Sequence, residues 1–268
     1  YNGLWNNRGE YIAQPEYHLW QYRLNLGFAQ RLASRWQSSI TIPYVWNYNG
    51  YPKSTSRTDG IGDTTINVWY EAVDDRSAWK IRNLKDMVPA VTIGVDLLVP
   101  TGISPYDNVS SSYDITGRGF YRLDGNVQIS KTVNPWNASL LLSYGTYLER
   151  WINSEFGRYI TPLRKQLGDR ASASISLGYI WYIGTAGDKL TGTGSFNYLT
   201  EGDTTYNGVR DTNSGFRKES VGAALAYAST DHDWSVRLSW SHAVRQDGWG
   251  DNFPTTDIYT LGVSYGFR

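Results

Sequence analysis

Large apolar residues recur at every second position along most of this chain. In the segment 20–28, the apolar positions alternate with residues that are polar or small; the apolar ones are Trp20, Tyr22, Leu24, Leu26 and Phe28. Side chains of a β-strand alternate between two faces, so this period predicts strands with one apolar and one polar face. A helical period is hard to find, and the best helix candidate is the short segment 78–87. The alternation therefore predicts an all-β fold.

Eleven segments carry this pattern. They are 20–28, 36–46, 66–70, 91–97, 121–129, 140–144, 173–181, 190–198, 221–227, 234–240 and 259–267. The links between them alternate in length, with short links near 31–34, 131–137, 184–188 and 229–233. The long links, rich in Gly, Asn, Asp and Ser, lie near 47–61, 101–118, 150–168, 201–215 and 246–256. The link 74–86 is the one exception, because it is long although it stands at the end of the strands where the other links are short.

Short turns at one rim and long loops at the other are typical of outer-membrane barrels. We therefore expect residues 1–268 to form a single domain, a transmembrane antiparallel up-and-down β-barrel with short periplasmic turns and long extracellular loops. The first and last of the eleven strands both start at the long-loop side, so an even antiparallel barrel needs twelve strands. Residues Tyr1–Arg8, with Leu4 and Trp5, are the candidate for the twelfth.

The composition agrees with a barrel in a membrane. The chain has 12 Trp and 21 Tyr, and its mean hydropathy is −0.47. Its longest apolar stretches, such as 95–99, are far shorter than the roughly 20 residues of a spanning helix. The aromatic residues gather at both ends of the strands around aliphatic centres, as in the two interfacial belts of a barrel. A soluble β-sandwich or propeller with an aromatic core would not be expected to keep this arrangement, so we predict the bacterial outer membrane, with lipid and lipopolysaccharide as neighbours.

The polar face of each strand would line the interior. We select seven of these residues as candidates for solute binding: Arg23, Asn25, Glu71, Asp96, Arg122, Asp124 and Arg237. Their signs are balanced, which predicts no strong ionic selectivity. Alternatively, Asp96 and Asp124 pair with Arg122 or Arg23 and only stiffen the wall. Aromatic residues such as Trp69 and Tyr147 also point inward by parity, which would suit an amphipathic or aromatic solute.

Two stretches resemble a known family. The segment Asp59-Gly60-Ile61-Gly62-Asp63, followed by Thr64–Tyr70, is similar to the glycine-rich turn and strand of the outer-membrane transporter family named for the meta-pathway of phenol degradation. The segment 88–102, which ends Val99-Pro100-Thr101-Gly102, is similar to a strand of that family, as is the strand pair in 124–147. The resemblance covers residues 59–147 and implies a small barrel that admits hydrophobic or aromatic compounds. The high Trp content and the weak first strand depart from the family pattern.

Other functional classes find little support. The formal net charge is zero, which argues against binding to nucleic acid. There is no Cys and there are only three His, so we expect no metal site and no cofactor. No Gly-x-Ser-x-Gly motif occurs, and His242 has Trp240 and Val244 as same-face neighbours rather than a serine, so we expect no enzyme.

Two functions remain open. The first is a channel for small, hydrophobic or aromatic solutes through a narrow lumen. The alternative is a non-conducting structural or interaction barrel that docks an envelope protein through its long loops or through 74–86. A monomer is the default expectation.

Overall fold

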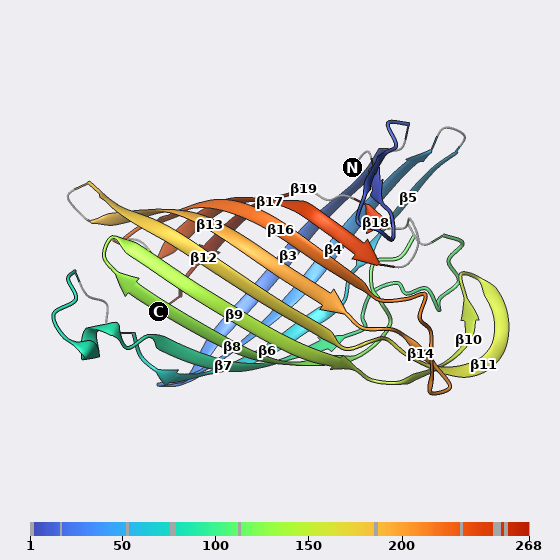
Figure 1. Cartoon of the computed structure of the whole chain (residues 1–268), viewed down its shortest axis with the longest axis horizontal. Coiled ribbons are helices and arrows are strands. Elements are labelled where there is room, and N and C mark those ends of the chain that lie inside the picture. Colours follow the sequence, from blue (N-terminus) through green and yellow to red (C-terminus); the bar gives the residue numbers. More distant parts are fainter. Residues whose placement is uncertain are drawn as a thin grey trace.

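The computed structural model describes residues 3–16, 18–51, 54–75, 79–111, 114–184, 187–230, 233–248, 253–254 and 257–267. Most of them form one strongly curled antiparallel sheet (Figure 1). Its long strands are β3 (His18–Ala33), β4 (Trp36–Tyr51), β6 (Thr64–Val73), β7 (Ala90–Val99), β8 (Arg122–Val133), β9 (Trp136–Tyr147), β12 (Arg170–Ile183), β13 (Asp188–Glu201), β16 (Phe216–Ala228), β17 (Trp234–Gly248) and β19 (Asp257–Tyr265). Each overlaps one of the eleven predicted segments, so this prediction is confirmed.

Each long strand pairs with its neighbours in chain order, which is the up-and-down topology expected. The sheet has one further strand, β5 (Ser54–Ile61). It pairs with the second half of β4, residues 44–51, whereas β6 pairs with residues 36–41 of the first half. Because β5 and β6 lie end to end along the same side of β4, they occupy a single position in the wall.

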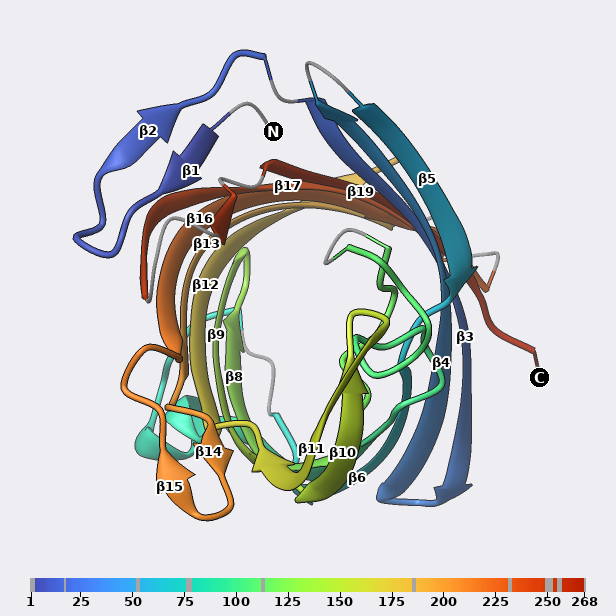
Figure 2. The same ribbon diagram turned by 90° about the vertical axis from the view of Figure 1, so that its right-hand side faces the viewer.

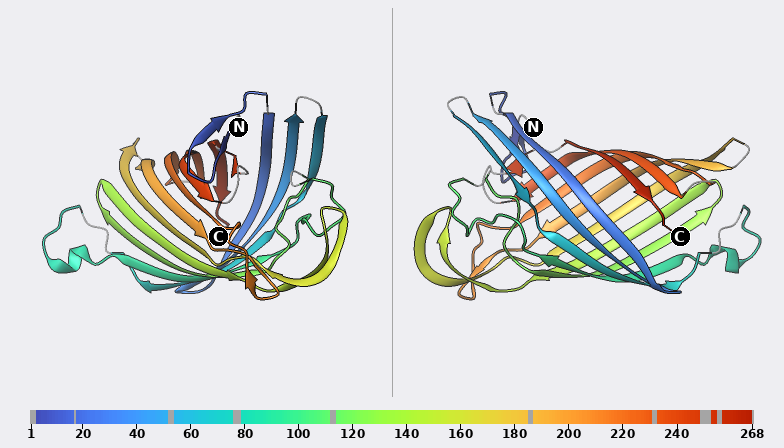
Figure 3. Two further views of the ribbon diagram at one scale, coloured as in Figure 1. Left: turned by 45° about the vertical axis from the view of Figure 1, so that its right-hand side comes forward. Right: turned by 180° about the vertical axis from the view of Figure 1, so that it is seen from behind.

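The two edges of the sheet are β3 and β19. Both run from the end that carries the long loops, the long-loop end, toward the opposite short-turn end (Figure 3). Within the described ranges, no pairing joins them. Two edges that run in the same direction are what an antiparallel wall with an odd number of positions must have.

Residues 3–8 do not supply a twelfth wall strand, so the prediction that residues 1–8 form one is wrong for the part that the structure describes. The segment β1 (Gly3–Trp5) pairs with β2 (Tyr11–Ala13) and β18 (Phe253–Pro254) in a separate small sheet at the long-loop end (Figure 2). The cause is local: the Asn6 side chain accepts hydrogen bonds from the backbone N–H groups of Arg8 and Glu10. This turn folds β1 back on β2 after three residues, too few to cross a bilayer. Residues 1 and 2 lie outside the described ranges.

The long-loop links contain hairpins that alternation did not predict. The strands β10 (Arg150–Glu155), β11 (Arg158–Gln166), β14 (Thr205–Tyr206) and β15 (Val209–Arg210) form a second sheet of four strands. Phe156 and Gly157 have φ of 49° and 70°, and Asn207 and Gly208 have 51° and 78°. Positive φ at both central residues is the signature of the tight two-residue hairpin turn.

The predicted helix is only one 3₁₀ turn, η1 (Leu84–Met87), within the described part of 78–87. Asn83 caps it, and Asp86 accepts hydrogen bonds from the backbone N–H groups of Arg82 and Asn83. These bonds, above all that from Arg82, lower the pKa of the Asp86 carboxyl. No helix in the described ranges has the length and hydropathy needed to cross a membrane.

The two faces of the sheet differ sharply. Side chains on the outer face include Leu26 and Leu238, which are 63% and 56% exposed, whereas Asp124 on the inner face is 5% exposed. The outer face also carries exposed aromatics toward both ends; they include Trp20, Trp46 and Tyr259 at one end and Phe28, Trp36, Trp136 and Tyr265 at the other. So continuous an apolar exterior is unfavourable in water and favourable in lipid. Phe120, which lies two residues before β8, does not belong to these belts, because its side chain is buried.

Candidate functional site: the lining of the barrel interior

The segment 100–121 between β7 and β8 is here called the inner loop, and its described residues, 100–111 and 114–121, fold into the space enclosed by the sheet (Figure 2). It is fastened to the wall at the junction of β5 and β6. The Thr101 hydroxyl donates to the carbonyl of Gly62 at 2.7 Å, and the Thr116 hydroxyl donates to that of Ile61 at 2.6 Å. The Asp63 carboxylate accepts from the backbone N–H groups of Gly102 and Arg118 at 3.2 and 2.7 Å.

Two glycines allow this junction to close. A Cβ added to Gly117 would overlap the Asp63 carboxylate, and one added to Gly102 would lie 2.8 Å from the backbone of Gly117. Asp63 and Gly102 belong to the two stretches that resemble the transporter family, Gly62-Asp63 and Thr101-Gly102, whereas Gly117 lies outside them. The structure therefore gives these motifs a common physical role, because together they hold the inner loop against the wall.

The inner loop brings Arg118 to a cluster built around Tyr147. The Tyr147 side chain is completely buried, and its hydroxyl accepts hydrogen bonds from Arg118 at 3.1 Å and Arg122 at 2.9 Å. Arg118 Nη1 also donates to both carboxylate oxygens of Glu201 at 2.6 Å. Arg122 Nε donates to both oxygens of Asp124, at 2.9 and 2.8 Å.

Each of these two carboxylates is therefore engaged by one arginine. Burial acts to lower the pKa of the Arg118 guanidinium, but the charge of Glu201 and the hydrogen bonds outweigh it, so that its pKa is raised. Both guanidinium groups also lie over the Tyr147 ring, at 5.8 Å for Arg118 and 5.2 Å for Arg122 from carbon to centroid. This is the range in which cations are attracted to aromatic faces.

The hairpin β10–β11 packs against the inner loop. The backbone N–H of Phe156 donates to the carbonyl of Pro105 at 2.7 Å, and Arg150 donates to that of Gly119 at 2.6 Å. Lys165 is buried; its ammonium donates to Glu155 at 2.8 Å and lies 5.4 Å from the ring centroid of Tyr106. Burial acts to lower the pKa of Lys165, but the charges of Tyr106 and Glu155 raise it overall.

Three of the seven predicted lining residues lie together. Asp96 and Asp124 are paired across neighbouring strands, and Arg122 binds the latter. The alternative that Asp124 pairs with Arg122 and stiffens the wall thus matches the geometry. The Asp96 Oδ1 atom is buried and has no hydrogen-bond partner among the described residues.

The other four predicted residues are spread over the wall. Arg23 and Asn25 lie exposed on the edge strand β3. Glu71 lies on β6, 3.9 Å from Arg31, and Arg237 lies exposed in the short-turn half of β17. These four do not converge on one site.

Sequence reasoning missed Arg118, Glu201, Arg170 and Lys218. The first is in a loop, and Glu201 and Arg170 stand at strand ends where the alternation stops. Lys218 could have been found, because it shares the parity of Ser220 and Gly222 on the polar face of β16.

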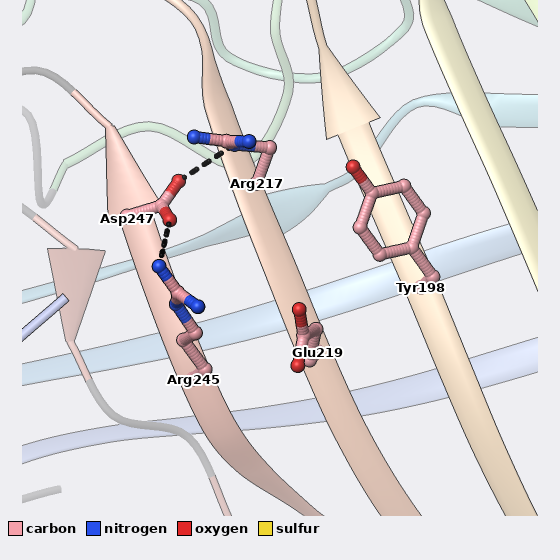
Figure 4. A pocket seen from close by; sticks show the side chains of 5 residues that line it. All are labelled: Tyr198, Arg217, Glu219, Arg245 and Asp247. Atoms are coloured by element: carbon pink, nitrogen blue, oxygen red, sulfur yellow. Dashed lines mark hydrogen bonds and ion pairs between the residues drawn. The ribbon is translucent and has the colours of Figure 1, made fainter.

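A shallow polar pocket lies on the outer face of the wall near the long-loop end, lined by Tyr198, Arg217, Glu219, Arg245 and Asp247 (Figure 4). Asp247 accepts from Arg217 at 3.0 Å and forms an ion pair with Arg245 at 3.3 Å. These residues form a charged rim above the apolar band. No group of three or more His, Asp or Glu side chains suited to a metal ion occurs among the residues that the structure describes.

Comparison with known proteins gives a likeness of fold. No family model matches the sequence, and no curated protein matches it. The crystal structure of the COG4313 outer membrane channel from Pseudomonas putida F1 superposes with a TM-score of 0.66 at 13% identity, covering 98% of this chain and 88% of that one. A structure of the NanC porin gives a TM-score of 0.46 at 14% identity, covering 92% and 99%. The chain thus has the fold of an outer-membrane β-barrel channel.

Proposed function

We propose that this chain is a bacterial outer-membrane channel through which small solutes, hydrophobic and aromatic ones among them, diffuse. The observation that carries the proposal is the sidedness of the wall, apolar outside and polar inside. Lipid satisfies the outer face, and a polar inner face lets water and solute pass. The charged rim of Figure 4 would meet lipopolysaccharide head groups above the apolar band.

The inner loop supports a narrow passage. It places Arg118 and Phe120 inside the wall, where the Phe120 ring packs edge-on against Tyr106 and Tyr147. Trp69 supports an aromatic solute, because its indole lies flat over Gly94 on the inner wall, where a Cβ would be 2.5 Å from the ring.

Conductance of the purified protein in planar lipid bilayers tests the proposal. Discrete current steps are the expected result, and swelling of loaded liposomes would rank neutral solutes by size and polarity. Protein that is folded, as judged by its heat-dependent mobility on gels, but carries no current would overturn the proposal.

The second candidate, a non-conducting docking barrel, is favoured by one observation. Trp79 and Leu84, in the link between β6 and β7 at the short-turn end, are 71% and 84% exposed. Large apolar side chains that are exposed in this way would pack against the surface of a protein partner. A barrel of this kind would carry no current and would lose its partner when both residues are replaced by serine.

A further inference from the structure

Two cations on the inner wall form no ion pair with any carboxylate in the part of the chain that the structure describes. Arg170 begins β12 and Lys218 lies near the start of β16, with β13 between them. No side chain among the described residues forms an ion pair or hydrogen bond with either, and both are half-buried. This differs from Arg118 and Arg122, whose charges are compensated by Glu201 and Asp124.

The pairing of the strands places both cations on the inner face. Arg170 stands opposite Gly145 on β9, which in turn stands opposite the buried Asp124 on β8. Lys218 stands opposite Leu199 on one side and the buried Gln246 on the other. The positive charge of Arg170 repels that of Lys218, so the two side chains lie close enough to interact electrostatically.

The nearby carboxylates are already engaged. Glu201 is the direct cross-strand neighbour of Arg170, yet Arg118 takes both of its oxygens. Arg122 likewise takes both oxygens of Asp124. Asp96 lies one strand beyond Asp124, further from Arg170. Arg122 and Arg118 add positive charge to the surroundings of Arg170, and Glu201 adds negative charge that it shares with Arg118.

We propose that Arg170 and Lys218 form an anion site at the long-loop end of the interior, and that its ligand is the carboxylate of a small organic solute. A guanidinium offers two parallel N–H donors that match a carboxylate, and the ammonium adds a second charge. Anion-conducting pores use Arg and Lys side chains in this way. The inference rests on the proposed channel function. It replaces the expectation of no ionic selectivity, because the positive and negative charges that balance over the whole chain do not balance at this place in the interior.

Binding tests the site without requiring current. Folded protein in detergent is titrated with benzoate labelled with ¹³C at its carboxyl carbon, and the carbon resonance is followed. Benzamide, the neutral isostere, serves as the comparison ligand. We expect saturable binding of benzoate, weakened roughly tenfold or more in Arg170→Gln and in Lys218→Gln, as for the loss of a charge-assisted hydrogen bond. Arg170→Lys keeps the charge and retains more binding than Arg170→Gln.

A matched control is Lys189→Gln. Lys189 is an exposed cation on β13 at the short-turn end, paired across Tyr182 and Ala228. The substitution removes one positive charge at a position away from the site, so benzoate should bind this variant as it binds the unmodified chain. Equal weakening in Lys189→Gln and Arg170→Gln would overturn the site, as would equal binding of benzamide and benzoate.

Bilayer recordings separate the two proposals. In a salt gradient, the reversal potential should favour anions and should move toward cations in Arg170→Gln. Current without an anion preference, together with benzoate binding that does not depend on residues 170 and 218, would refute the anion site but not the channel. Benzoate binding that depends on both residues, in a protein without current, would refute the channel and leave the site.

Discussion

Tyr147 holds two arginines at once. Its ring is fully buried and its hydroxyl accepts from both Arg118 and Arg122. Since Arg118 arrives on the inner loop and Arg122 on β8, the hydroxyl ties the loop to the wall. Its inward direction follows from strand parity, but its partners could not be predicted, because a 22-residue loop leaves the place of Arg118 open.

Replacing Tyr147 by phenylalanine removes only the hydroxyl. We expect the free energy of unfolding to fall by about 1.5–3 kcal/mol, the range for a hydrogen bond to a charged group. Unfolding in urea followed by Trp fluorescence measures it. Tyr144→Phe is the control, because the Tyr144 hydroxyl donates to Asp169 from an exposed position. Equal effects of the two substitutions would contradict the role of Tyr147.

Asp96 and Asp124 place two carboxylates side by side on neighbouring strands. Like charges directly opposite each other destabilise a sheet. Asp96→Asn removes one of them and gives this half-buried position a neutral amide. We expect the free energy of unfolding to stay unchanged or to rise by up to ~1 kcal/mol. A loss of more than ~1 kcal/mol in the same urea titration would mean that the Asp96 charge is needed.

Among the elements, the wall strands could be predicted and the loop hairpins could not. Alternation identifies β4 or β13 because only one face of each is apolar. In β10 and β11 both faces carry polar and charged residues, so no period stands out. Asn207-Gly208 is a strong hairpin signal that was available in the sequence. The pairing of β1 with β18, over 240 residues apart, has no local signal at all.

The inner loop depends on its junction with the wall. Asp63→Ala leaves the backbone N–H groups of Gly102 and Arg118 without their acceptor, which costs about 1–3 kcal/mol for a buried group. We expect the loop to loosen, trypsin to cleave after Arg118, and the single-channel conductance to increase. Asp59→Asn is the control, since Asp59 accepts from the exposed Tyr44 hydroxyl. A variant that is as resistant to trypsin as the unmodified chain would contradict this role of Asp63.

Lys165 keeps the hairpin β10–β11 closed. Its raised pKa means that folding favours the charged form, so its contribution is complete below the ordinary lysine value of about 10.4 and is lost only above it. Resistance to trypsin at Arg158 and Arg164 should therefore be the same at about pH 7 and about pH 9. Lys165→Met should expose both sites, and Lys165→Arg should restore protection. Loss of protection between these pH values would contradict the assignment.

At the scale of the whole molecule, the sequence predicts the sidedness of the wall but not its closure. Serines on successive strands illustrate the polar inner face: Ser139 and Ser176 share a hydrogen bond of 2.7 Å, and Ser195 is the cross-strand neighbour of Ser176. Phe196, the next residue after Ser195, is exposed on the outer face. Closure depends on how β3 and β19 meet, and no local period encodes that contact.

The absence of cysteine makes the sidedness directly measurable. Single cysteines are introduced as Ser195→Cys and Phe196→Cys, and the current through each variant in a bilayer is recorded before and after a charged, membrane-impermeant thiol reagent is added. We predict a stepwise fall of the current for Ser195→Cys and no change for Phe196→Cys. Equal modification of both, or a response of Phe196→Cys alone, would contradict a channel with a polar interior and an apolar exterior.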